Sequence, residues 1–294
     1  MERTRIGFLG LGLMGSGMVK NLVSDGYSVI GYDIDPQKIE AAVHQGATGI
    51  DDPSELPQQT DVIMLSLPNS RVVHDVIKNN LKLLAEKREK LVVIDTTTSD
   101  PIMVEALAAD LKRRGVEMLD ATISGTSKMC AERDITFMVG GNEKVFIEYE
   151  HIFSTLGKKT YYLGESGAGS TMKLIVNLVL GLNRMVLAEG LALGRRIGMD
   201  LHRLLDVLKN SAAYSKAMDM KGVKMIAEDF IPPEGTLASH RKDVHMILEL
   251  GARVNQPLFL SAVHAQALAS QVAKGRGDWD ISALIKFYHD LSIA

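Results

Sequence analysis

The chain has 294 residues, a length that predicts about two domains and permits sizeable hydrophobic cores. With 46% hydrophobic and 23% charged residues it has the composition of a soluble globular protein, and its net charge of −3 provides no electrostatic basis for binding nucleic acid or an anionic membrane. The single cysteine, Cys130, excludes an intrachain disulfide and suits a reducing cytosol, so we expect a cytoplasmic protein.

Two apolar segments resemble a signal peptide and a membrane span, but the residues that interrupt them argue against both interpretations. The N-terminal apolar run follows basic residues, as in a signal peptide, but glycines break it repeatedly. Residues 174–193 are apolar enough to suggest a membrane span, but polar and charged residues such as Arg184 and Glu189 interrupt them. We therefore expect no membrane interaction.

A glycine-rich loop near the N-terminus carries the first functional signal. A strand-like run at residues 5–9 leads directly into Gly10-Leu11-Gly12-Leu13-Met14-Gly15, and a helical pattern follows. In this context the first glycine permits a tight turn, the second lets the backbone approach a pyrophosphate, and the third lets the helix pack closely. The helix N-terminus supplies N–H groups and a positive dipole end. All six loop residues are predicted to bind a dinucleotide.

An acidic residue follows the second predicted strand. Residues 28–32 form that strand, and Asp33 comes 18 residues after Gly15, where a carboxylate is expected to bind the ribose hydroxyls. The next residues are Ile34 and Asp35 rather than arginine, so a 2′-phosphate here would meet like charge. The cofactor predicted from these positions is NAD rather than NADP.

Strand and helix patterns alternate over the first half of the chain, which predicts a mainly parallel, doubly wound α/β sheet. Further strands are expected at residues 62–67, 91–95, 117–121, 135–139 and 160–163, with helices at 36–45, 69–86, 101–114 and 143–156. Ligands bind beyond the carboxyl ends of such strands. The turns at 67–69, 96–98 and 122–126 should therefore line one crevice, although turns favour their Ser, Thr, Asn and Gly residues in any case.

The second half reads as helix almost throughout. Helices are predicted through Arg196 and at residues 200–211, 244–254, 257–274 and 281–290, which gives an expected division into domains 1–165 and 166–294. Lys173 and Asn177 stand four residues apart and so share one face of a largely apolar helix. Such residues are costly to bury without a function, but they also have an ordinary alternative, which is to extend to solvent or cap a loop.

Taken together, four motifs resemble the β-hydroxyacid dehydrogenase family, which includes 3-hydroxyisobutyrate dehydrogenase and tartronate semialdehyde reductase. The motifs occur in the family's order, and the resemblance extends over nearly the whole chain. The motifs are Gly10-x-Gly12-x-Met14-Gly15 with Gly17-Met18, then Asp120-Ala-Thr-Ile-Ser124-Gly125-Thr126, then Gly167-x-Gly169-x-x-x-Lys173-x-x-x-Asn177, and lastly Lys242-Asp243. The third is the most specific, because its lysine is the family's catalytic residue.

The resemblance implies a Rossmann domain joined by a long helix to an all-helical domain, within a homodimer or homotetramer. It also implies that Lys173 donates and accepts the proton and that Ser124, Gly125 and Asn177 hold the substrate. Lys242 would close the pocket near both substrate and nicotinamide. The family positions that contact the cofactor are matched here by Leu67, Pro68, Asn69 and Thr98.

The substrate loop departs from the family's usual Asp-Ala-Pro-Val-Ser-Gly-Gly. Thr122 replaces the proline and Thr126 the second glycine. A side chain at position 126 is expected to narrow the space beside the substrate's acid group and to add a hydroxyl donor, which makes Thr126 a further substrate-binding candidate. This loop therefore does not distinguish a carboxylate substrate from a sulfonate, and the chain length of the substrate is not specified by the sequence.

The resulting hypothesis is an NAD-dependent oxidoreductase that interconverts a small anionic β-hydroxy acid and its semialdehyde. Lysine acts as a base only when it is neutral, and burial of Lys173 beside a second cation, Lys242, would favour the neutral form. No His, Cys, Asp and Glu set has metal-ligand spacing, so no metal is expected. Two alternatives remain: an imine reductase of the same superfamily, against which Lys173 and Ser124-Gly125 argue, and a non-catalytic dinucleotide-binding module.

Overall fold

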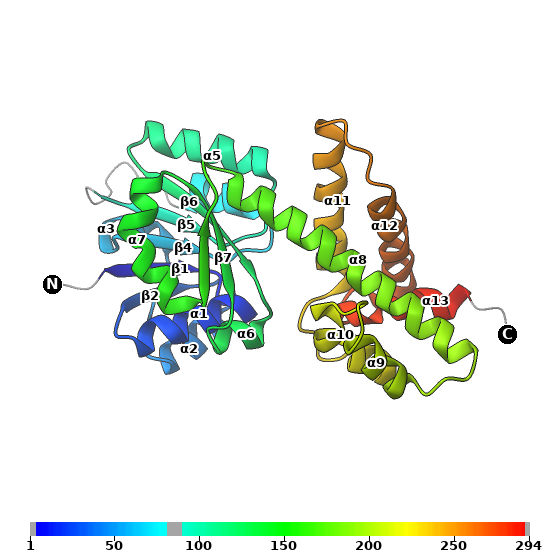
Figure 1. Ribbon diagram of the computed structural model, residues 1–294. Coiled ribbons are helices and arrows are strands. Elements are labelled where there is room, and N and C mark those ends of the chain that lie inside the picture. The colour runs from blue at the N-terminus through cyan, green and yellow to red at the C-terminus, as the bar shows by residue number, and fades with distance from the viewer. Residues whose placement is uncertain (1–3, 81–89, 292–294) are drawn as a thin grey trace. The chain divides into compact units, whose positions relative to one another are not determined.

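The computed structural model describes residues 4–80 and 90–291, and the chain divides into two compact units, residues 1–173 and 174–294 (Figure 1). The first unit is an α/β sandwich and the second is helical. One long helix, α8 (Ala168–Arg196), begins in the first unit and continues into the second. The predicted class, a doubly wound α/β domain followed by an all-α domain with a long connecting helix, is confirmed.

The first unit is built on one sheet of eight strands in the order β3-β2-β1-β4-β5-β6-β7-β8. Neighbouring strands run parallel except for β6 and β7, which are antiparallel. The strands are β1 (Arg5–Leu9), β2 (Ser28–Tyr32), β3 (Thr48–Gly49), β4 (Val62–Leu65), β5 (Val92–Asp95), β6 (Glu117–Ser124), β7 (Thr136–Gly141) and β8 (Lys159–Tyr162). β3 was not predicted, because two residues are too few to show a periodic pattern.

Helices cover both faces of the sheet (Figure 1). One face packs against α1 (Leu13–Ser24), α2 (Pro36–His44), α6 (Ser127–Ala131) and α7 (Glu143–Leu156), and the other against α3 (Leu56–Gln59), α4 (Ser70–Asp75) and α5 (Pro101–Arg113). Alternate residues of β4 enter the two cores: Val62 and Met64 one, Ile63 and Leu65 the other. Burial on both faces explains why such strands read as continuous apolar runs.

Three segments of this unit differ from the sequence expectation. The helix expected at 69–86 is α4, which gives way to a π-helical segment, η2 (Val76–Asn80), and residues 81–89 lie outside the described residues. β6 continues to Ser124 instead of ending at residue 121, because its last residues pair with β7 as far as Thr136. The short helices α3 and α6 and the 3₁₀ turn η1 (Pro53–Glu55) were not predicted.

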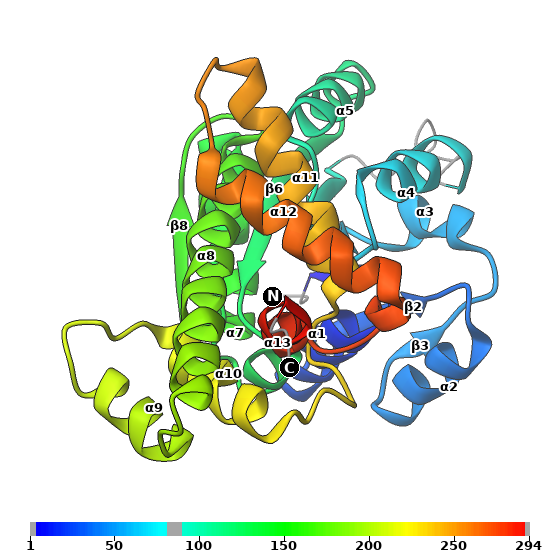
Figure 2. The same cartoon turned by 90° about the vertical axis from the view of Figure 1, so that its right-hand side faces the viewer.

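The second unit consists of helices around one apolar core. They are the later part of α8, α9 (Leu201–Lys209), α10 (Lys216–Ala227), α11 (Leu237–Arg253), α12 (Phe259–Gln271), the π-helical η4 (Val272–Arg276), the 3₁₀ segment η5 (Ile281–Leu284) and α13 (Ile285–Leu291). Figure 2 shows α11 and α12 side by side. α10 was not predicted.

The start of α11 corrects one expectation. The sequence placed Lys242-Asp243 at the opening of a helix, but α11 already begins at Leu237, because the Thr236 hydroxyl oxygen accepts a hydrogen bond from the Ser239 N–H at 3.1 Å. Lys242 and Asp243 therefore lie inside the helix. Their side-chain directions are consequently set by helical geometry rather than by a flexible cap.

Within the described residues, α8 is long and apolar enough to cross a membrane by length and composition alone. The core helix of a globular unit meets the same criteria. Leu174, Leu187 and Leu191 of α8 are buried in the core of the second unit, so protein packing accounts for part of its apolar character.

Candidate active site

The glycine-rich loop between β1 and α1 has room for a ligand at one position and none at two others. Gly10 has a φ of +95°, and a Cβ there would overlap the Ser66 carbonyl oxygen. A Cβ on Gly15 would overlap the carbonyl oxygen of Gly10. By contrast, a Cβ on Gly12 would meet nothing within 4 Å. Packing therefore requires glycine at 10 and 15, whereas Gly12 faces open space.

The first turn of α1 is free to bind an anion. Gly12 is its N-cap and supplies no side-chain cap, and the first turn holds no acidic residue. The N–H groups of this turn and the positive end of the helix dipole are therefore directed to the open space beside Gly12. The residues present fit the pyrophosphate of a dinucleotide.

Asp33, immediately after β2, holds the loop in place. Its Oδ2 accepts a hydrogen bond from the Leu11 N–H at 2.8 Å, and its Oδ1 accepts one from the Asp35 N–H at 3.0 Å. Lys38 Nζ lies 3.5 Å from the same Oδ1, a contact that the sequence analysis missed. A carboxylate oxygen accepts more than one hydrogen bond, so Asp33 retains capacity for ribose hydroxyls.

The predicted cofactor residues Leu67, Pro68, Asn69 and Thr98 follow β4 and β5, which are adjacent parallel strands. The structure brings their two turns together, because the Leu67 N–H donates to Thr97 Oγ1 at 3.1 Å. Asn69 also has a structural role: its Oδ1 accepts from the Val72 N–H at 3.1 Å and caps α4. Its side-chain oxygen is thus already engaged.

The substrate loop begins at the end of β6. Thr122 is fully buried, and its hydroxyl donates to the Gly169 carbonyl at 2.8 Å, so this departure from the family pattern ties the strand to the first turn of α8. Ser124 is the last residue of β6, and Gly125 has a φ of +154°. The Thr126 oxygen accepts from the Met129 N–H at 3.3 Å and caps α6. This bond leaves the hydroxyl hydrogen of Thr126 available as the donor expected from the sequence.

Lys173 lies close to this loop. Its Nζ donates to the carbonyl oxygen of Ile123 at 2.5 Å, next to Ser124. The side chain is half-buried and is directed to the end of β6 rather than extended to solvent. The side chain therefore does not simply extend to solvent, and its catalytic role stays a prediction.

Asp120 fixes the helix that carries Lys173. Its Oδ1 accepts from the Gly167 N–H at 2.9 Å and its Oδ2 from the Ser170 N–H at 2.8 Å, so one carboxyl group pairs two N–H groups at the start of α8. Burial raises the pKa of Asp120, and these hydrogen bonds counteract part of that rise. Close approach also requires Gly169, since a Cβ there would overlap the Asp120 carbonyl oxygen.

In the helical unit, Asp243 connects the two predicted substrate residues Asn177 and Lys242. Asn177 Nδ2 donates to Asp243 Oδ2 at 2.9 Å, and Lys242 Nζ lies 3.4 Å from Asp243 Oδ1. Because a carboxylate only accepts, it fixes which end of the Asn177 amide faces it. The sequence motif contained Asp243 but assigned it no role.

A buried cation lies near the same carboxylate. Burial lowers the pKa of Arg184 to about 10, while the charges of Asp280 and Asp243 counteract the fall. In the part of the chain that the structure describes, no group of three or more His, Cys, Asp and Glu side chains could hold a metal ion.

Comparison with known proteins also indicates a dinucleotide-binding protein. Residues 5–164 match the NAD binding domain of 6-phosphogluconate dehydrogenase, and residues 167–288 match the NAD-binding domain of NADP-dependent 3-hydroxyisobutyrate dehydrogenase. The fold and the glycine-rich loop thus define an oxidoreductase with a nicotinamide dinucleotide cofactor.

Individual relatives narrow the class. The chain is 32% identical to 2-(hydroxymethyl)glutarate dehydrogenase of Eubacterium barkeri, over 99% of this chain and 97% of the relative. The structure of Mycobacterium tuberculosis 3-hydroxyisobutyrate dehydrogenase with L-serine is 28% identical, covers 99% of both chains and superposes with a TM-score of 0.88. The chain belongs to the β-hydroxyacid dehydrogenase family.

A third relative has a different architecture. The chain is 30% identical to the cytokine-like nuclear factor N-PAC of Pongo abelii over 97% of its length, but it spans only 51% of that protein. The shared part is therefore the two-unit fold.

Proposed function

We propose that the protein interconverts a small β-hydroxy acid and its semialdehyde with NAD(H), and that Lys173 is the general acid–base. The observation that carries this proposal is the position of Lys173 Nζ on the Ile123 carbonyl, beside Ser124. Two relatives are named for hydroxy acids, 2-(hydroxymethyl)glutarate and 3-hydroxyisobutyrate, which supports a substrate of the same class.

The proposed chemistry divides the work between cofactor and protein. Bound nicotinamide supplies the hydride acceptor for the carbinol carbon. Lys173 takes the hydroxyl proton during oxidation and returns it during reduction, and Asn177 directs the substrate hydroxyl.

The substrate's acid group is assigned to the loop after β6. The backbone N–H groups of Ser124 and Gly125 and the Ser124 hydroxyl suit a compact anion, either carboxylate or sulfonate, and Lys242 adds a positive charge. Thr126 is assigned to the same group. Its oxygen already accepts the capping hydrogen bond of α6, and its hydroxyl hydrogen can donate to an anion.

NAD(H) is proposed over NADP(H) because of Asp33. This carboxylate is held by the Leu11 and Asp35 N–H groups at the end of β2, where a 2′-phosphate would meet its charge. Lys38 does not supply a free cation for that phosphate, since it is shared between Asp33 at 3.5 Å and Asp35 at 3.9 Å.

A homodimer or homotetramer in the cytoplasm is the proposed state of the protein. Ile175, Val179, Val186 and Leu193 of α8 are exposed at spacings of four and seven residues, so they share one helix face. Light scattering on purified protein tests the assembly. The free, buried Cys130 is compatible with a reducing compartment.

A steady-state absorbance assay tests the reaction. NADH oxidation is followed with a panel of carboxylated and sulfonated semialdehydes, with cyclic imines in parallel. Turnover of a semialdehyde supports the proposal. Turnover of imines alone would instead indicate an imine reductase, and NADH binding without turnover a non-catalytic module.

A further inference from the structure

The turns after β4 and β5 are joined by a short chain of hydrogen bonds. The Asp95 carboxylate accepts from the Thr97 N–H at 2.9 Å, and Thr97 Oγ1 accepts from the Leu67 N–H at 3.1 Å. At the outer end, Ser70 Oγ accepts from the Asp100 N–H at 2.8 Å. The Leu67–Thr97 and Ser70–Asp100 bonds each join residues 30 apart in sequence, so they set the spacing of the two turns.

The Asp95–Thr97 bond is buried, and the Leu67–Thr97 bond is partly buried. Asp95 is 1% exposed and Thr97 is 3% exposed. An N–H group that loses its acceptor in such a place retains part of its desolvation penalty. Without the Thr97 hydroxyl, the turn at 67–69 therefore loses its hydrogen bond to the turn at 96–98, and the Leu67 N–H needs another acceptor.

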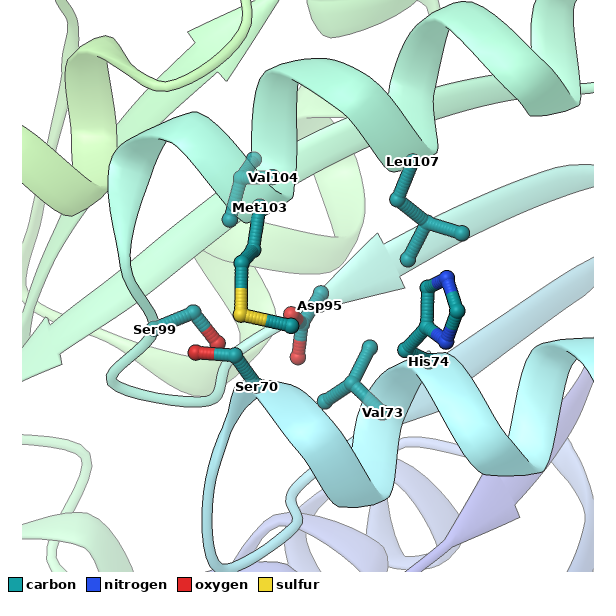
Figure 3. Close-up of a pocket in the computed structure, with 8 residues that line it drawn as sticks. All are labelled: Ser70, Val73, His74, Asp95, Ser99, Met103, Val104 and Leu107. Carbon is teal, nitrogen blue, oxygen red and sulfur yellow. The ribbon is translucent and has the colours of Figure 1, made fainter.

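Asp95 lies beside a small cavity between α4 and α5, shown in Figure 3. Ser70, Val73 and His74 line it from α4, and the other side chains beside Asp95 come from the β5–α5 turn and from α5 itself: Ser99, Met103, Val104 and Leu107. Within the described chain, Asp95 Oδ2 has no hydrogen-bond partner. Its other oxygen, Oδ1, accepts the backbone hydrogen bond from the Thr97 N–H.

The charged form of the Asp95 carboxyl group is stabilised mainly by Thr97. Burial raises the pKa of Asp95 to about 7, hydrogen bonds from the Thr97 side chain and backbone counteract the rise, and the Asp120 carboxylate on β6 adds to it. Asp120 is its register partner, and His74 is the ionisable group that α4 contributes to the cavity. Thr97 is therefore the main group that stabilises this carboxylate.

We propose that Asp95 and Thr97 are positioning residues for the dinucleotide: they hold the turns at 67–69 and 96–98 at one spacing without touching the cofactor themselves. The inference rests on the proposed function, which assigns Leu67, Pro68, Asn69 and Thr98 to the cofactor. Thr97 sets cofactor affinity because it connects the turn that contains Thr98 to the turn that begins at Leu67.

Thr96 provides a matched control within the same turn. It is also buried, at 7% exposed, and its hydroxyl donates to the Leu65 carbonyl of β4 at 2.7 Å, not to the turn at 67–69. Thr96→Val and Thr97→Val thus remove one buried hydroxyl each from neighbouring positions. Only the second removes the bond that joins the turns, and Thr97→Ser retains it.

The experiment measures NADH dissociation constants by nicotinamide fluorescence on the full chain, with KM values for NADH and for the acid alongside. Thr97→Val is expected to weaken NADH binding about tenfold and to raise the KM for NADH more than that for the acid. Thr97→Ser and Thr96→Val are expected to stay within about twofold of the wild type. Equal losses for Thr96→Val and Thr97→Val, or none for Thr97→Val, would overturn the inference.

A second pair of variants keeps the test decisive if Thr97→Val does not fold. Asp95→Asn retains an acceptor for the Thr97 N–H and should bind NADH nearly as the wild type does, whereas Asp95→Ala should weaken it about tenfold. Equal affinity for both variants would also overturn the inference. If the wild type does not bind NADH, it is the proposed function that fails, and this outcome is seen before any variant is compared.

Discussion

Lys173 and Ile123 are joined by a hydrogen bond from the lysine Nζ to the strand carbonyl at 2.5 Å. This bond uses one of the three donor positions of an ammonium group, and it directs the group to the end of β6 beside Ser124. The backbone carbonyl orients the amine without neutralising it. A substrate whose acid group is held at Ser124, as we propose, would therefore meet a lysine that is already positioned.

Replacing this lysine is expected to abolish turnover while leaving the cofactor site intact. Lys173→Met keeps the length and helix propensity of the side chain but removes the proton carrier, so kcat should fall about 10²–10⁴-fold. NADH affinity and the thermal midpoint should change little. Lys112→Met, at an exposed lysine of α5, is the control and should keep native kcat. A Lys173→Met protein with more than about a tenth of native kcat would remove lysine from the mechanism.

Cofactor choice is expected to depend on Asp33. The wild type should use NADH at least about tenfold more efficiently than NADPH, because like charges at close range cost more than about 1.4 kcal/mol in a partly desolvated site. Asp33→Ser should narrow that ratio, and it should also weaken NADH binding, since the Leu11 N–H loses its acceptor. Both effects are read from kcat/KM with each cofactor.

Asp35→Ser is the matched control for that variant. Asp35 caps α2 through the Gln37 N–H and pairs with Lys38, but the hydrogen bond to the glycine-rich loop comes from Asp33. The control should leave NADH affinity near native. A wild type that uses NADPH as well as NADH would contradict the assignment before any variant is made.

The loop after β6 predicts a requirement for an anionic substrate. Without an acid group, the donors that we assign to it at Ser124 and Gly125 lose the acceptor for which they are proposed, so uncharged alcohols of the same size should be poor substrates. The measurement compares kcat/KM for 3-hydroxypropionate and n-propanol. The expected ratio is at least about 10², and comparable values would show that the anion site is wrongly placed.

The buried carboxyl of Asp95 predicts a pH dependence of stability. Burial raises its pKa from 3.8 to about 7, so between these values the folded protein binds more protons than the unfolded chain does. The contribution of Asp95 to stability is therefore largest below pH 4 and declines as the pH rises to about 7, by on the order of 4 kcal/mol.

Asp95→Asn isolates this effect because it cannot titrate. The difference in unfolding free energy, wild type minus variant, should fall between pH 4 and 7 and level off above that range. Urea unfolding at a series of pH values measures it. A difference that does not change with pH would show that Asp95 does not change its protonation between these values.

Several features of this protein follow from local sequence alone. The glycine-rich loop, the alternation of strands and helices and the helical second half are visible because the hydrophobic periods of strand and helix differ and because glycine is required where a Cβ would overlap backbone, as at Gly10 and Gly15. The motif around Lys173 likewise identified the lysine from residue types and spacing. Short elements such as β3, with two residues, and α6, with five, were not predicted because they are too short for a hydrophobic period to repeat.

Only the tertiary structure decided which groups satisfy one another. Nothing in the sequence shows that Asp120 pairs the first N–H groups of α8 or that Thr97 bonds to Leu67. Hydrogen bonds of this kind join residues from strands and turns that are distant in the chain and become neighbours through sheet order. Each side chain there has several possible partners in sequence, and burial favours the pairing that leaves the fewest polar groups without a hydrogen bond.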